Sequence, residues 1–303
     1  RVNADFTYFK TRCEDQYVTG FRLSYATGFV LNNMNVGTFE TNGWDLHVDG
    51  DVLRLQNGLR WNVGMNLSHS TSEVTHLPEN VSEYYNAYTW LSGNLRNGII
   101  KGHPVTTMTG KAYQRNKKGD VLISPTTGLP LVSDEWSVVG DRQPDMEFGL
   151  TTAISWKNFR LSALASGKLG FTVVNGTKRD MMGTGSSWES VTLRESKPVV
   201  FTGVLKDGHE DSANPTVNSI AVTYNNYGSS IYTGGDEDWL EEDINFLRLS
   251  EVRLSYNVPS SWLKRATKNF VSSASIWAKA TDLVTLTNYS GIDPVGNSNS
   301  AAL

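Results

Sequence analysis

The amino-acid sequence predicts an all-β fold made of long antiparallel strands. Apolar and polar residues alternate with a period of two along several stretches, which is the pattern of a strand with two different faces. Aromatic residues, which favour strands, are plentiful, because the 303 residues include 9 Trp, 12 Tyr and 11 Phe. Short connections alternate with long ones along the chain. Together these observations argue against a helical protein.

The first expected strand covers residues 2–10, where the even positions up to Tyr8 carry the apolar side chains. A hairpin follows, with strand 44–52, a connection at 53–58 and strand 59–67. Both arms alternate strictly, as Trp44 and Leu46 do against Asp45. The sequence therefore predicts three long strands in the first quarter of the chain.

The second hairpin has arms at 146–156 and 159–169, joined by the tight turn Lys157-Asn158. A third pair consists of strand 251–258 and a return strand at 271–279, whose alternation is weak. Their connection, 259–268, has the sequence of a single helical turn around Trp262. The count is thus seven strands, with long connections at 11–42, 73–145 and 170–245.

Two architectures fit this pattern. In a soluble β-sandwich the apolar face of each strand packs on a second sheet, whereas in an outer-membrane barrel it faces lipid. No run of about 18 apolar residues is present, as a transmembrane helix would need, but a membrane-spanning strand needs only about 10 alternating residues. The long connections at one end and the aromatic residues near strand ends favour the barrel, although strand-end aromatics also occur in soluble sheets. Those aromatic residues are Trp44, Trp61, Trp156, Phe159 and Tyr256.

Charge and cysteine content exclude several classes of protein. The 27 Lys and Arg against 31 Asp and Glu give a net charge of −4, so the chain has no basic footprint for nucleic acid. Its densest basic run, residues 115–118, has the composition of a solvated turn. The single cysteine, Cys13, excludes an internal disulfide.

No catalytic or metal-binding constellation stands out, so neither an enzyme nor a cofactor is expected. The five histidines lack metal-ligand spacing. The densest acidic run offers Asp236, Asp238 and Glu241 as a weak calcium alternative to an ordinary solvated loop. A surface glycoside hydrolase has no supporting motif.

Four motifs resemble those of SusC/RagA-like TonB-dependent transporters. The stretch Gly140-Asp141-Arg142-Gln143-Pro144-Asp145 precedes the strand and turn that end in Trp156-Lys157-Asn158-Phe159. The other three lie in order along the chain and run through most of its length. They are residues 35–46 with Trp61, residues 246–259 (FLRLSEVRLSYNVP) and residues 279–294, in which Asp282 replaces the family's usual Asn.

The resemblance implies that residues 1–303 are the C-terminal part of a TonB-dependent receptor β-barrel of about 22 strands in the bacterial cell outer membrane. The plug domain and the final strand of the family pattern are absent from the sequence. The implied function is TonB-energised import of a glycan or peptide nutrient with a SusD-like surface lipoprotein. The implied partners are that lipoprotein, the TonB complex, outer-membrane lipid and an oligosaccharide or oligopeptide substrate. The alternative is a soluble or surface-anchored β-sandwich module that binds carbohydrate.

Two sets of candidate site residues follow. Polar residues opposite the apolar face are expected to face the lumen: Asp45, His47, Asp49, Arg60, Asn62, Asn66, Glu147, Arg160, Lys168, Glu251 and Arg253. Aromatic residues of the long connections are expected either to contact ligand or partner, as flat rings do at low entropic cost, or to pack their own loops. They are Tyr84, Tyr85, Tyr88, Trp90, Trp188, Tyr224, Tyr227, Tyr232 and Trp239.

Overall fold

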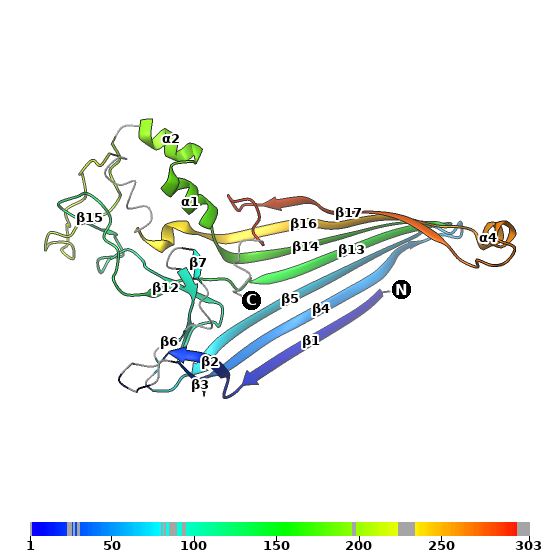
Figure 1. Ribbon diagram of the computed structural model, residues 1–303, viewed down its shortest axis with the longest axis horizontal. Helices are drawn as coiled ribbons and strands as arrows, with labels where there is room; N and C mark the ends of the chain where they lie inside the picture. The colour runs from blue at the N-terminus through cyan, green and yellow to red at the C-terminus, as the bar shows by residue number, and fades with distance from the viewer. Residues whose placement is uncertain are drawn as a thin grey trace.

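One seven-stranded antiparallel sheet forms the body of the protein (Figure 1). The structure is a computed structural model, and it describes residues 2–22, 26, 28, 31–79, 81, 83–84, 90–92, 95–195, 198–223 and 234–295. The strand order follows the chain: β1 (Val2–Cys13), β4 (Thr38–Arg54), β5 (Arg60–His76), β13 (Met146–Trp156), β14 (Phe159–Val174), β16 (Leu240–Asn257) and β17 (Ser275–Thr287). The predicted all-β meander of seven strands is confirmed.

The tight connections lie together at one end of the sheet, on the right of Figure 1. Between β4 and β5 the chain turns with a backbone hydrogen bond from Leu55 to Leu59, and Gly58 takes a φ of +87°, which glycine adopts without strain. Between β13 and β14 the two-residue turn places Lys157 at a φ of +52°. The expected helical turn is helix α4 (Ser260–Ala266). We call this end the turn end.

Most strands are longer than the alternation predicts. Strands β4 and β5 have 17 residues each and β16 has 18, so they continue past the alternating segments. In β5 the added residues, 68–76, are mostly polar on both faces, so they carry little apolar alternation although the backbone pairing continues. The three long connections are correspondingly shorter than expected.

The position of the last strand was predicted incorrectly. Strand β17 begins at Ser275 and ends at Thr287, whereas the sequence indicates residues 271–279. Its register with β16 shifts between Leu249 and Glu251, and Asp282 has a φ of +51° there. This β-bulge interrupts the pairing inside the strand. The pairing begins where Ser275 lies opposite Asn257, so residues 271–274 belong to the connection.

Short elements fill the long connections, and the alternation signal predicts none of them. Two hairpins and a four-stranded sheet lie between the first four long strands: β2 (Tyr17–Arg22) with β3 (Leu31–Asn35), β6 (Glu83–Tyr84) with β9 (Ile99–Ile100), and β7 (Trp90–Ser92), β8 (Leu95–Asn97), β10 (Thr107–Gly110) and β12 (Ser137–Asp141). The last connection holds α1 (Gly176–Thr184), α2 (Trp188–Glu195), the 3-10 turn η3 (Asp236–Trp239) and β15 (Val204–Leu205), which pairs with β11 (Leu122–Ile123).

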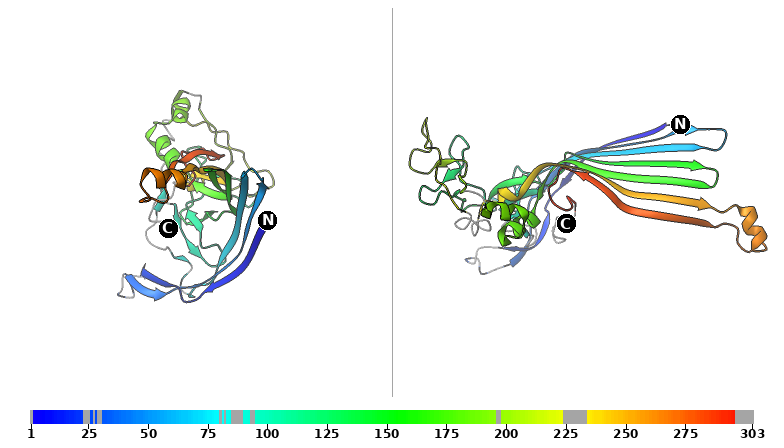
Figure 2. Two further views of the ribbon diagram at one scale, coloured as in Figure 1. Left: turned by 90° about the vertical axis from the view of Figure 1, so that its right-hand side faces the viewer. Right: turned by 90° about the horizontal axis from the view of Figure 1, so that it is seen from above.

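The buried cores lie at the opposite end, which we call the loop end. One cluster gathers Val36, Val74, Leu77 and Ile99, and a second packs Phe171 against Phe246 with ring centroids 6.1 Å apart. The sheet itself is a curved wall (Figure 2). No helix among the described residues is long and apolar enough to cross a membrane.

Candidate functional site

The sheet has one apolar and one polar face. Residues paired across antiparallel strands point to the same side, so the register assigns each side chain to a face. On the apolar face Phe6 lies opposite Leu46, and Leu161 opposite Leu254. These side chains are exposed, Phe6 at 63% and Leu254 at 48%. Within the described residues no second sheet covers this face, so the sandwich architecture is wrong.

Aromatic residues border the apolar face at both ends. Toward the loop end, Tyr8 pairs with Trp44. At the turn end, Trp61 lies opposite Leu53, and the rings of Phe159 and Tyr256 are 4.6 Å apart. The strand from Trp44 to Leu53 measures about 30 Å at roughly 3.3 Å per residue. With a strand tilt of about 40°, that length gives an apolar band close to the ~25 Å height of outer-membrane barrels.

The register places all the residues expected to face the lumen together on the opposite, polar face. His47 lies opposite Asn66, Glu147 opposite Lys168, and Arg160 opposite Ser155. The same pairings extend across the sheet to the remaining residues of the set: Asp45, Asp49, Arg60, Asn62, Glu251 and Arg253.

Polar contacts tie neighbouring strands together on this face. The Nδ1 of His47 lies 2.5 Å from Asn66 Oδ1, and its Nε2 lies 3.3 Å from Asp49. Lys168 Nζ donates to Glu147 at 2.9 Å, which links β14 to β13. These side chains remain partly or fully exposed, so water screens the ion pairs, which chiefly fix side-chain orientation.

Two open hollows mark the polar face. The first, about 540 Å³, lies at the turn end over small side chains such as Ala153 and Ser155. The second, about 460 Å³, lies farther toward the loop end and contains Arg248 and Ser250. Arg248 pairs with Asp293 at 2.7 Å, which holds the segment after β17 against this face.

The loop aromatic residues divide into buried and exposed groups. Tyr84 is 5% exposed and packs in the core with Val36 and Val74, and burial raises the pKa of Tyr84 to about 12. Trp239 is 8% exposed, so it and Tyr84 offer no ligand surface in this conformation. Trp188, the first residue of α2, is 82% exposed. The others lie outside the described residues, Trp90 by its side chain alone: Tyr85, Tyr88, Trp90, Tyr224, Tyr227 and Tyr232.

The three acidic residues considered for calcium do not converge. Asp236 accepts a hydrogen bond from the backbone of Lys111 at 2.7 Å, and Asp238 accepts one from the hydroxyl of Tyr113. Burial raises the pKa of Asp238, although the Tyr113 hydrogen bond opposes that shift. Glu241 points to a different cluster. Among the described residues no group of three or more candidate ligands is suited to hold a metal.

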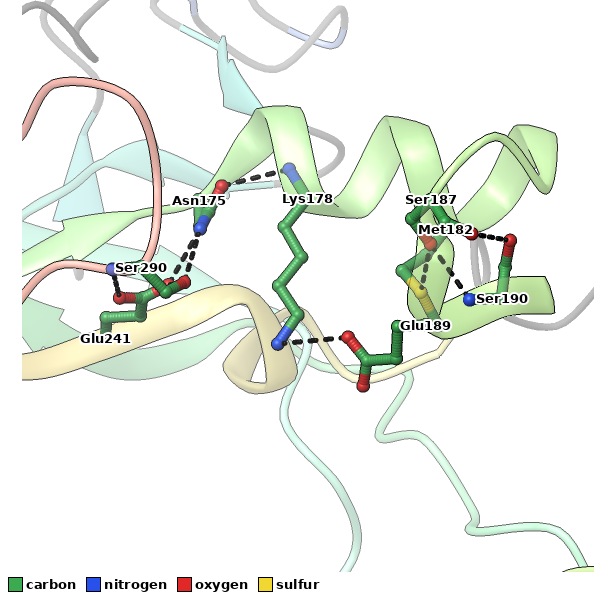
Figure 3. Close-up of polar contacts among 8 residues, drawn as sticks. All are labelled: Asn175, Lys178, Met182, Ser187, Glu189, Ser190, Glu241 and Ser290. Atoms are coloured by element: carbon green, nitrogen blue, oxygen red, sulfur yellow. Dashed lines mark hydrogen bonds and ion pairs between the residues drawn. The ribbon is translucent and has the colours of Figure 1, made fainter. Parts of the chain in front are cut away.

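A polar clasp at the loop end joins three parts of the chain that are far apart in sequence (Figure 3). Asn175 caps α1 by accepting a hydrogen bond from the backbone of Lys178 at 2.9 Å. Its amide donates to Glu241 of β16 at 2.7 Å and to Ser290, after β17, at 3.1 Å. Glu241 also accepts from the backbone and the hydroxyl of Ser290, at 2.8 and 2.5 Å. We call these three residues, Asn175, Glu241 and Ser290, the clasp.

The clasp fixes the α1–α2 hairpin to the wall of the sheet. Asn175 is only 2% exposed, so its hydrogen bonds compete little with water. Ser187 caps α2 through the backbone of Ser190 at 3.0 Å, and Lys178 of α1 lies 3.6 Å from Glu189 of α2. The sequence argument missed this cluster, although an Asn directly before a helix is a recognisable capping signal.

The basic run at residues 115–118 contacts polypeptide. Arg115 pairs with Glu237 at 2.7 Å, and Lys118 Nζ donates to the carbonyl oxygens of Ser212 and Ala213 at 2.8 and 2.9 Å. These contacts join the second and third long connections at the loop end. The run forms a turn with Lys117 exposed, as predicted, and Arg115 and Lys118 also stabilise loop packing.

A long sheet with one exposed apolar face, one polar face, tight turns at one end and structured loops at the other defines a class: the wall of a transmembrane β-barrel. The described strands form an open segment of such a wall, because β1 and β17 are not paired with each other.

Comparisons with known proteins agree with this class. No family model matches the chain. Two curated proteins of Formosa agariphila are similar to it: TonB-dependent receptor P26, at 23% identity, and TonB-dependent receptor P3, at 20%. Each alignment covers 98% of this chain, which spans 30% of the first relative and 29% of the second.

Solved structures show the same fold. A structure of the RagAB peptide transporter matches 97% of this chain and 31% of its own, with a TM-score of 0.61 and 19% identity. The RagAB peptide importer in the "open-open" state matches with a TM-score of 0.62, also at 19% identity, over 97% of this chain and 30% of that one. These likenesses confirm the resemblance to SusC/RagA-like TonB-dependent transporters that the motifs predict.

Proposed function

We propose that this chain forms part of an outer-membrane transporter that imports a nutrient with energy delivered through TonB. The observation that carries the proposal is the two-faced sheet, which matches TonB-dependent receptors over 98% of the chain. Its exposed apolar face, about 25 Å tall between two aromatic borders, suits contact with lipid. The side chain of Leu150, in the middle of that face, is 39% exposed. Exposing such apolar surface to water is unfavourable in free energy, whereas contact with lipid is favourable.

The polar face then lines the transport path. The residues proposed for the lumen, from Asp45 to Arg253, all share that face. They mix both signs of charge with hydroxyl and amide groups, as at the Glu147–Lys168 pair. A polar wall of this kind lets a hydrophilic solute pass without binding it tightly, because no single charge dominates over the full height of the wall. The protein acts by transport, and we propose no enzymatic role.

The substrate class is a glycan or a peptide, and a SusD-like surface lipoprotein acts as partner at the loop end. Peptides are the first class to test, because the similar solved structures are those of a peptide transporter. The proposed partner surface includes Trp188, whose exposed ring lies on the hairpin held by the clasp. Exposed aromatic rings are favoured at protein interfaces.

Cell fractionation and uptake test the proposal. The protein should be found in the outer-membrane fraction and should require detergent for purification. Deleting its gene should abolish growth on one oligopeptide or oligosaccharide source, and depleting TonB should have the same effect. A protein that purifies as a stable monomer without detergent would contradict the proposal. So would uptake that continues without TonB.

A further inference from the structure

Three arginines share a single cross-strand row at the turn end of the polar face. Arg54 of β4 lies directly opposite Arg60 of β5, Arg60 lies opposite Ser155 of β13, and Ser155 lies opposite Arg160 of β14. We call Arg54, Arg60 and Arg160 the arginine row. Neighbouring strands are about 4.8 Å apart, so the three side chains arise within about 15 Å on one side of the sheet.

The positive charge of the row is not neutralised within the described part of the chain. None of the three guanidinium groups forms an ion pair or a side-chain hydrogen bond with a described residue. Asp51 lines the same hollow but makes no ion pair with them. Elsewhere on this face Lys168 and Lys279 are paired with Glu147 and Glu251, and Arg253 lies over the ring of Trp277. Like charges directly opposite each other destabilise a sheet, so the row needs an anionic partner.

The side chains next to the arginine row are short and leave room for that partner. Ser155 separates Arg60 from Arg160, and Ala153 and Asn62 follow in the next row. These short side chains line the 540 Å³ hollow together with Arg60, Arg160 and Lys157. Guanidinium groups bind the planar carboxylate group through two parallel hydrogen bonds, and Ser155 and Asn62 supply further donors.

We propose that the hollow at the arginine row is a binding site for a carboxylate group. The inference rests on the proposed function only in placing the polar face inside the protein. A resident partner, namely an acidic side chain of polypeptide inside the curve of the sheet, fits better than a passing solute. The reason is that the repulsion between Arg54 and Arg60 is present at all times, so its neutralisation is required whether or not solute is being moved.

Zero-length cross-linking tests the proposal on the protein as the cell makes it, purified from outer membranes. The variants Arg60→Lys and Arg160→Lys keep the positive charge and introduce a primary amine. A water-soluble carbodiimide then joins that amine to any carboxylate in direct contact, and mass spectrometry identifies the product. The Lys279–Glu251 pair is a built-in positive control, and Lys264 of α4, which is exposed and forms no ion pair with a described residue, reports background reaction.

Each outcome decides the question. An amide bond between position 60 or 160 and an acidic residue of the protein supports the proposal with a resident partner. If that bond is absent but added glutarate acylates these positions several-fold more than Lys264, the carboxylate comes from a solute. If neither product forms while Lys279 still links to Glu251, the proposal is overturned. The readout requires no transport, so a failure of the proposed import leaves this test intact.

A second measurement uses the unaltered protein and guards against misfolded variants. Phenylglyoxal modifies accessible arginine side chains. Arg60 and Arg160 should react slowly because a carboxylate occupies them, or should become protected when glutarate is added. Fast modification that glutarate does not slow would contradict a carboxylate site.

Discussion

Replacing Asn175 with alanine should release the α1–α2 hairpin from the sheet without unfolding the sheet. Asn175 is 2% exposed, and it serves both as the cap of α1 and as a donor to Glu241 and Ser290. Alanine removes all three side-chain hydrogen bonds. The long strands keep their ladders, so the effect should be confined to the loop end.

The expected magnitude follows from these contacts. Loss of a helix cap costs about 0.5–2 kcal/mol. The two donated hydrogen bonds add about 1–2 kcal/mol, a value reduced because Glu241 is only partly buried. A total near 1.5–4 kcal/mol makes local opening roughly 10- to 700-fold more frequent, at about 1.4 kcal/mol per factor of ten.

Hydrogen exchange measured by mass spectrometry in detergent checks this expectation. Amides of residues 176–184 should exchange faster by that factor in Asn175→Ala, whereas amides of 147–155 in β13 should not change. The control Asn175→Ser keeps the cap but loses the amide donor, so its effect should be intermediate. Ser290→Ala should weaken docking but leave the cap intact. If the α1 amides of Asn175→Ala exchange at the same rate as those of the unaltered protein, the proposed role of the clasp in docking α1 is refuted.

Three further expectations concern the clasp and the sheet. Burial opposes ionisation of Glu241, but the hydrogen bonds that its carboxylate accepts outweigh this effect and hold its pKa below the ordinary 4.5. Docking of α1 should therefore be fully present above pH 4.5 and should be lost as the pH falls through the lowered pKa. Glu241→Gln should remove this pH dependence in hydrogen-exchange data corrected for intrinsic rates. Gly167→Ala should prevent stable folding, since a Cβ there would lie 2.3 Å from a backbone oxygen of β16, whereas Gly149→Ala, with its nearest contact at 3.7 Å, should fold normally by heat-dependent gel mobility. On the apolar face Leu150→Arg should lower the free energy of unfolding, measured with urea in lipid vesicles, by about 2–4 kcal/mol, and Thr151→Arg on the polar face should lower it by about 1 kcal/mol or less. Equal losses of stability would contradict the assignment of the faces.

The residues near the turn end were the most predictable from sequence. There one face of each strand meets an apolar phase and the other a polar phase. Apolar and polar residues therefore alternate with a period of two, as Leu161 and Ser162 do. The turns were equally predictable, because Gly58 and Lys157-Asn158 interrupt the alternation over a few residues. The faces of the sheet therefore followed from local pattern alone.

The loop end was much less predictable. Tyr84 and Trp188 have similar sequence surroundings, yet one is buried at 5% exposure and the other is 82% exposed. Their burial depends on which other connection packs against them, and local sequence carries little information about such contacts. The strand β17 was misplaced for a related reason, since its start is set by pairing with β16, in which Ser275 lies opposite Asn257.

The sequence by itself determined the all-β class, the seven strands and the division of their residues between an apolar and a polar face. It did so because strand geometry converts alternation along the chain into two faces, whatever the rest of the fold does. Only the tertiary structure decided which polar residues meet: Asn175 with Glu241 and Ser290 at the clasp, and Arg54 opposite Arg60 at the arginine row. Those meetings depend on strand register and on loop packing between residues as many as 115 positions apart, and the registry of distant strands is fixed by the assembled sheet.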